Sequence, residues 1–242
     1  MAYRCRNCIR LVDEPAGFDV TRLVLLFSLY CNSELAMGFI RTFILPKDVD
    51  FNNALCAQAH ITRTIVEDLR NACVDKDASA RAAISVHADE ARALKTKNMK
   101  ELLDVFIAPY DKESIYRMIT QLDWITLSVR HFILEIEAYG ILSIQEYQPI
   151  FEVLVEMATL LEQGVTHLSK KSPKILTHDI DLIHHKYNHA VELCARSIAT
   201  LLNQDDYKRI ILHKEIVTQL KEVAKRIQVT ANSLEDMAIK VV

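Results

Sequence analysis

The 242-residue chain contains only 4 Gly and 5 Pro. Turn-dense β folds, collagen-like repeats and low-complexity chains need these residues in larger numbers, so the composition excludes those classes. The glycines are scattered, which also excludes a Gly-rich phosphate-binding loop. Positive charge is not in excess, because 29 Lys and Arg stand against 32 Asp and Glu. The net charge of -3 excludes the usual electrostatic pattern of a nucleic-acid binder.

A long hydrophobic run and a disulfide framework are also missing. The apolar run at residues 23–31 is nine residues long, whereas a membrane-spanning helix needs about 20. Six Cys in a chain of this length are typical of reduced, mostly buried thiols in a cytosolic protein. The Cys5-x-x-Cys8 pair is short of the four ligands of a structural zinc site and lacks the strand-helix context of a redox motif.

Half of the residues are apolar, and the few breakers divide them into long uninterrupted segments. The breaks fall at Pro46, Pro109, Gly140 with Pro149, and Pro173. Between them the apolar residues recur with the period of a helix, and no segment alternates for long enough to be a strand. We therefore predict an all-α protein with six helices, at residues 49–73, 78–105, 112–139, 145–170, 174–202 and 206–240.

Local signals predict several helix ends. Asp111 is placed to cap the third helix, and Gly140 is placed to end it. Asp205 or Asp206 can cap the last helix by accepting backbone N–H bonds that otherwise have no partner. Pro149 indicates that the regular part of the fourth helix begins there.

The last predicted helix has the clearest amphipathic pattern. Its apolar residues step by three or four and form one stripe, made of Ile216, Leu220, Val223, Ile227, Ala231, Leu234, Met237 and Val241. Lys214, Lys221, Glu222 and Lys225 fall off this stripe, so we expect them to be solvated.

A short repeat indicates two halves. The sequence ITQL at residues 119–122 reappears as VTQL at residues 217–220, which is 98 positions later. Each copy lies in the third helix of a triplet, so we expect two tandem three-helix units in one elongated bundle. The units would cover residues 37–140 and 141–242, and Leu122 and Leu220 should both be buried.

Three segments carry a resemblance to a known family. They are FILPKD at residues 43–48 followed by Phe51, FIAPYDKE at residues 106–113, and KEI at residues 214–216. Over residues 37–242 the chain resembles the PhoU-related family, whose members are small helical proteins encoded beside low-affinity inorganic phosphate (Pit-type) transporters. The resemblance implies the tandem three-helix fold and a cytoplasmic, non-catalytic role in phosphate uptake or its regulation, in contact with a transporter or a signalling protein. Association with the inner face of the membrane or with a second copy of the chain stays open at this point.

The resemblance also implies acidic pairs spaced i, i+4, which hold a cation between helices in this family. In this chain the corresponding positions hold Ala88 and Arg92, Asp123 and Leu127, Tyr187 and Val191, and Lys221 and Lys225. Only Asp123 keeps a carboxylate. We therefore do not transfer the metal function, and we expect no cofactor.

Residues 1–36 differ in composition from the remainder and hold half of the six cysteines. Basic residues precede the apolar run, as in a signal peptide, but Glu34-Leu35-Ala36 is a poor cleavage site. We expect the natural chain to start at Met37, so that residues 1–36 are an over-called start or an extension outside the family. The alternative is a genuine short amphipathic extension.

Nine histidines give a competing hypothesis, a metal-binding helical bundle for storage or sensing. Asp181, His185 and His189 are spaced i, i+4 on the fifth helix. Such a stripe could bind zinc or iron if another helix supplied ligands, with Asp123 among the residual acids. The alternative is an ordinary polar helix face.

The remaining chemistry-bearing residues favour structural roles. The spacings contain no arrangement for nucleophilic catalysis, so we expect no enzymatic activity. Trp124 is predicted to be a core anchor, and Cys56 and Cys194 are predicted to pack as small hydrophobic residues. The basic turn at residues 170–174 is ordinarily solvated, but it could touch anionic lipid or phosphate.

Overall fold

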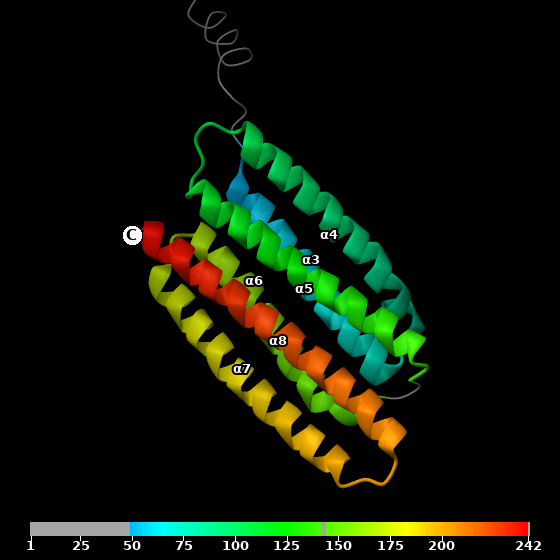
Figure 1. Cartoon of the computed structure of the whole chain (residues 1–242). Coiled ribbons are helices and arrows are strands. Elements are labelled where there is room, and N and C mark those ends of the chain that lie inside the picture. The colour runs from blue at the N-terminus through cyan, green and yellow to red at the C-terminus, as the bar shows by residue number, and fades with distance from the viewer. Residues whose placement is uncertain (1–48, 142–143, 242) are drawn as a thin grey trace, which may run out of the picture. The chain divides into compact units, whose positions relative to one another are not determined.

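In a computed structural model, residues 49–141 and 144–241 are described, and every regular element in them is helical (Figure 1). The elements are α3 (Phe51–Arg70), the π-helical turn η1 (Asn71–Asp75), α4 (Ala78–Asp104), α5 (Lys112–Ala138), the 3₁₀ turn η2 (Gln145–Tyr147), α6 (Gln148–Ser169), α7 (Pro173–Leu202) and α8 (Tyr207–Val241). The all-α prediction is confirmed, and each predicted helix corresponds to one of the six long helices.

Several sequence features lie outside the described residues. They are the Cys5-x-x-Cys8 pair, the apolar run at residues 23–31, the expected start at Met37 and the family-like segment at residues 43–48. Val241 belongs to α8, but its side chain is also outside the described part of the chain.

The helix ends follow the local signals. The carboxylate of Asp111 accepts a backbone N–H bond of 3.2 Å in the first turn of α5. Asp206 does the same for α8 at 3.1 Å. Gly140 has φ +64° directly after α5, a conformation that glycine adopts without steric cost. Pro149 lies in the first turn of α6, as predicted.

The first helix ends differently from the prediction. Regular α-helix stops at Arg70, and a π-helical turn continues to Asp75, followed by Lys76 in the left-handed conformation with φ 58°. The wider π turn keeps Cys73 and Val74 buried while the chain turns towards α4. A π turn is decided by such local packing and not by the apolar period.

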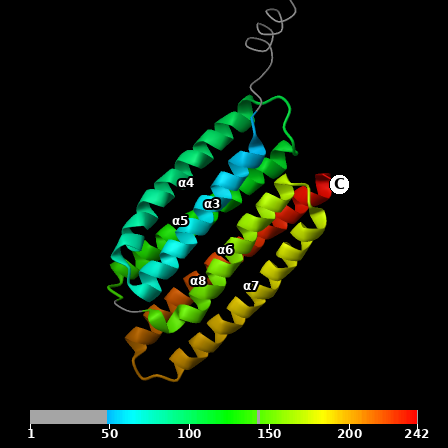
Figure 2. The same ribbon diagram turned by 180° about the vertical axis from the view of Figure 1, so that it is seen from behind.

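The six long helices form two three-helix units. Helices α3, α4 and α5 pack against one another, and so do α6, α7 and α8. The units join through α3 against α6 and α5 against α8. Figure 1 shows α5 and α8 side by side, and Figure 2 shows α3 and α6 side by side from behind. Helices α4 and α7 lie at the outer sides, where each keeps a wide exposed face.

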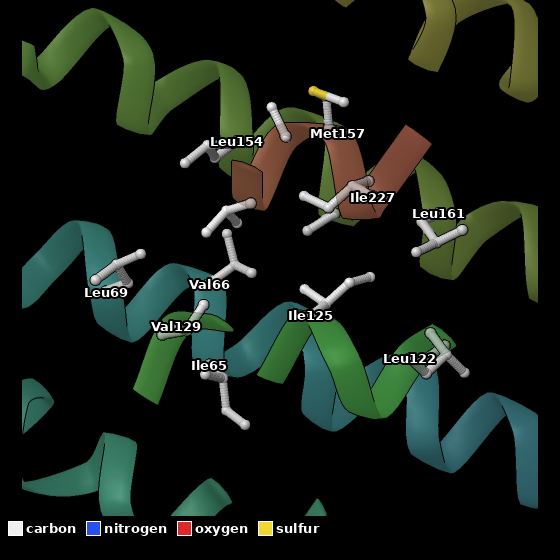
Figure 3. Close-up of a cluster of buried hydrophobic side chains, with 14 of the residues drawn as sticks. Ile65, Val66, Leu69, Leu122, Ile125, Val129, Leu154, Met157, Leu161 and Ile227 are labelled. Carbon is white, nitrogen blue, oxygen red and sulfur yellow. The ribbon is translucent and has the colours of Figure 1, made fainter. Parts of the chain in front are cut away.

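The core lies where α3, α5, α6 and α8 converge (Figure 3). Ile65, Leu122, Met157 and Ile227 come from these four helices and are fully buried. Leu220 is also fully buried, which confirms the prediction for both copies of the repeat. The α8 stripe from position 216 to position 237 is buried throughout, while the off-stripe lysines 214, 221 and 225 are exposed.

Candidate protein-docking surface

The histidine stripe lies on α7, at an outer side of the bundle. Asp181, His185 and His189 share the exposed face of this helix. The charged neighbour of His189 is Glu192 on the same helix, with 3.9 Å between Nδ1 and Oε2. That face turns away from the helices that could add ligands. Among residues 49–141 and 144–241, no three His, Cys, Asp or Glu side chains lie close enough together to hold a metal ion.

Asp123, the residual acid of α5, is paired with a lysine. Lys95 Nζ of α4 donates to Asp123 Oδ2 at 2.5 Å, and the carboxylate is largely buried. Its i+4 neighbour Leu127 offers no ligand atom. At this position an ammonium group of the chain itself neutralises the carboxylate that a cation would otherwise meet.

A serine and a lysine also meet, at the junction of α5 and α8. Lys240 Nζ donates to Ser114 Oγ at 2.9 Å, and its other neighbours are Asp236 at 3.0 Å and Asp111 at 3.6 Å. The hydrogen bond to Asp236 and the charges of both carboxylates raise the pKa of Lys240. A general base needs the opposite shift, so the raised pKa favours a structural role for this cluster, which joins two helices.

A buried polar group at the other end of α8 was not predicted. Tyr147 Oη lies 2.8 Å from His213 Nδ1, and Glu146 Oε1 lies 3.1 Å from the same nitrogen. Burial and the charge of Arg209 lower the pKa of His213, while Glu146 opposes this effect. Burial also raises the pKa of Tyr147. One signal was present in the sequence, because His213 stands three positions before Ile216 and extends the apolar stripe.

Both cysteines of the sequence prediction lie on the long helices. Cys194 is fully buried in α7, and burial raises the pKa of its thiol to about 11. Cys56 is half-buried against the core. Both therefore pack as small hydrophobic residues, as predicted.

The prediction that Trp124 anchors the core is wrong. Its side chain is 44% exposed. Position 124 is two residues from the buried Leu122, which is roughly 200° around the helix and therefore on the opposite face. The guanidinium Cζ of Arg226 on α8 lies 5.2 Å from the centroid of the Trp124 ring. The indole thus lies at the surface, where α5 meets α8.

Trp124 belongs to a row of exposed large apolar residues that we name the α5 stripe. Its members are Tyr116, Trp124, Leu127 and Leu134, with exposed fractions of 55%, 44%, 36% and 55%. They share one side of α5, because at roughly 100° per residue they lie within about 80° of one another around the helix. Exposed apolar residues gathered on one helix face are a candidate interaction site on a protein surface.

Charges on the bordering helices follow a simple pattern. Across the packing interface between α4 and α5, three ion pairs form. Arg81 pairs with Glu137, Asp89 with Arg130 and Lys95 with Asp123. Seven other exposed cations on α4 and α8 form no ion pair with any described residue: Arg92, Lys97 and Lys100 on α4, and Lys208, Lys214, Lys221 and Lys225 on α8. These cations outnumber the exposed carboxylates without an ion pair on the same two helices, which are Glu90, Asp104 and Glu235, so the helices flanking α5 carry an excess of unmatched positive charge.

The chain was compared with protein-family models and with known protein sequences. No protein-family model matches the chain. UPF0111 protein YkaA of Bacillus subtilis is 28% identical over 154 residues, which cover 59% of this chain and 70% of that protein.

Two solved structures are similar in fold. One is a PhoU-like protein from Shewanella oneidensis MR-1, with a TM-score of 0.62, 14% identity, and coverage of 79% of this chain and 97% of that chain. The other is a PhoU-like phosphate regulatory protein from the same organism, with a TM-score of 0.60, 15% identity and the same coverage of 79% and 97%. The chain therefore has the fold of the PhoU-like helical bundles, built from two tandem three-helix units.

Proposed function

We propose that the chain is a non-catalytic accessory or regulatory protein of inorganic phosphate transport, acting by contact with other proteins. The observation that carries the proposal is the shared fold with a PhoU-like phosphate regulatory protein over 79% of this chain. The α5 stripe supports the mode of action, because exposed apolar residues on one helix face are typical of surfaces that contact other proteins.

The partner in this proposal is a low-affinity, Pit-type phosphate transporter or a signalling protein connected with it. Support comes from the family-like segment FIAPYDKE at residues 106–113, which forms the α4–α5 junction and the start of α5. Among the described residues, no helix is both long and apolar enough to cross a membrane. We place the protein in the cytoplasm, held at the inner face of the membrane through its partner.

Deletion of the gene in the organism that encodes the protein tests this proposal. The initial rate of radiolabelled phosphate uptake is measured at scarce and at abundant external phosphate. We expect deletion to change the rate at one or both concentrations at least twofold, and the wild-type gene to restore it. Unchanged uptake together with unchanged expression of phosphate-responsive genes would contradict the proposal.

A further inference from the structure

We propose that the α5 stripe docks an acidic amphipathic helix of a partner protein. This inference rests on the proposed function only in assuming that the chain acts through protein contacts. The proposal commits to one surface, made of Tyr116, Trp124, Leu127 and Leu134, and to the chemistry of its occupant, which has an apolar face flanked by Asp or Glu.

The stripe is the one side of α5 that packing within the bundle leaves uncovered. The other sides of α5 contact α3, α4 and α8. Figure 1 shows α5 between α4 and α8, with its remaining side turned outwards. On the same helix, the core-facing positions from Ile115 to Ile136 are buried. The apolar residues of the stripe therefore stay partly exposed in the described part of the chain, although Trp124 also contacts Arg226 of α8.

The dimensions of the stripe fit a helix. Tyr116 and Leu134 are separated by 18 positions, so at 1.5 Å per residue the stripe is roughly 27 Å long. An occupying helix of about 18 residues would present apolar side chains at i, i+3, i+4 and i+7 along this length. Tyr, Trp and Arg are the residue types that most often dominate binding energy at interfaces, and Trp124 with Arg226 supplies two of them at the middle of the stripe.

The cations on the helices beside α5 favour a partner helix with acidic flanks. Arg92 and Lys100 on α4 and Lys225 on α8 are exposed on the two helices that flank α5, and they form no ion pair with the described residues. Acidic residues on the flanks of an occupying helix would meet these cations from both sides. A helix with basic flanks would instead bring like charges together, which costs affinity.

The same charges disfavour a second copy of this chain as the occupant. A two-fold symmetric contact places the same surface of each copy against itself. Arg92 and Lys225 of one copy would then approach the cationic border of the other. The acidic helix of a different protein avoids this repulsion.

The chain carries a built-in probe, because Trp124 is its single tryptophan. The full chain is titrated with an 18-residue peptide that has Leu at the helical spacing, Glu on its flanks, and no Trp or Tyr. A matched peptide replaces every Glu by Lys. We expect the Glu peptide to shift the emission of Trp124 to shorter wavelength with saturation, and to bind at least tenfold more tightly than the Lys peptide. Added salt should weaken the binding.

Exposed-site variants test where the peptide binds. Leu127→Ser and Leu134→Ser should each weaken the Glu peptide about tenfold, and Arg92→Gln should weaken it severalfold. The matched control is Ile175→Ser, which removes an exposed apolar side chain from α7, where Ile175 is 51% exposed, and should leave binding unchanged. Circular dichroism of each variant confirms that the helices are intact.

Three outcomes would overturn the proposal. One is equal binding of the two peptides, or no shift with either. Another is a Trp124 shift with phosphatidylglycerol vesicles but not with the peptide, which assigns the face to a membrane. The third is a dimer in sedimentation that Leu134→Ser dissociates, which assigns it to a second copy. None of these depends on phosphate uptake, so failure of this inference and failure of the proposed function remain distinguishable.

Discussion

Arg226 of α8 lies over the ring of Trp124 of α5, with 5.2 Å between the guanidinium Cζ and the ring centroid. The two residues come from the two halves of the bundle, so this contact ties one half to the other at the surface. Glu222, one turn earlier on α8, also pairs with this guanidinium, with 3.1 Å between its Oε1 and Nη2 of Arg226.

Removing the cation from this contact should destabilise the fold modestly. Arg226→Met keeps a chain that can cover the indole but loses the cation–π interaction, so we expect a loss of about 0.5–1 kcal/mol in the free energy of unfolding. Urea unfolding followed by Trp124 fluorescence measures it. Lys225→Met, one position away and exposed, is the control and should change stability less. Equal losses for both variants would show that the stacking contributes nothing specific.

The two copies of the repeat should be equally important for stability. Leu122 and Leu220 are fully buried, and truncation of a buried Leu to Ala typically costs about 2–5 kcal/mol. We expect Leu122→Ala and Leu220→Ala each to lose free energy of unfolding in this range. Lys221→Ala, at an exposed position beside the second copy, should stay within about 0.5 kcal/mol. Chemical denaturation of the three variants measures these free energies of unfolding. A loss for Lys221→Ala as large as that for either Leu variant would contradict the prediction.

His213 should make stability depend on pH. Burial and Arg209 hold its pKa below the 6.5 of an ordinary histidine, against the opposing charge of Glu146. Above pH 6.5, His213 is neutral in both the folded and the unfolded chain, so its contribution to the free energy of unfolding is fully present. As pH falls from 6.5 towards the lower folded pKa, the unfolded chain binds a proton first, so stability is lost.

The test compares urea unfolding at about pH 7.5 and about pH 5.5. The wild-type chain should lose more free energy of unfolding between these values than His213→Gln, which cannot titrate. The control is His131→Gln, which removes an exposed imidazole and should follow the wild type. If His213→Gln retained the full pH dependence, the loss would have to come from other groups.

The purified protein should carry at most sub-stoichiometric transition metal. Asp123 is neutralised by Lys95. The resemblance to the PhoU-related family implies carboxylates at positions 221 and 225, where this chain has lysines. Elemental analysis of untagged protein measures the metal content. One or more tightly held Fe or Zn per chain, lost on His185→Ala, would reverse this expectation and favour a metal-binding bundle.

The candidate surface could be predicted from the sequence only in part. The positions of Tyr116, Leu127 and Leu134, roughly 120° to 140° around the helix from Leu122, follow from helical geometry alone. Trp124 was assigned to the core on its residue type, although its register places it on the same outer face as these residues. Residue type misled here because a large apolar side chain is stable at the surface when a guanidinium covers its ring.

The amino-acid sequence by itself determined the helices and their ends. Apolar period, N-cap carboxylates, Gly140 and the prolines act within a few residues of each other, so their effects can be read along the chain. Tertiary structure alone decided that Lys95 meets Asp123, that Tyr147 meets His213, and which side of α5 stays uncovered. Those contacts join residues far apart in sequence, and they depend on the rotation and register of packed helices, which side-chain packing sets and local pattern does not.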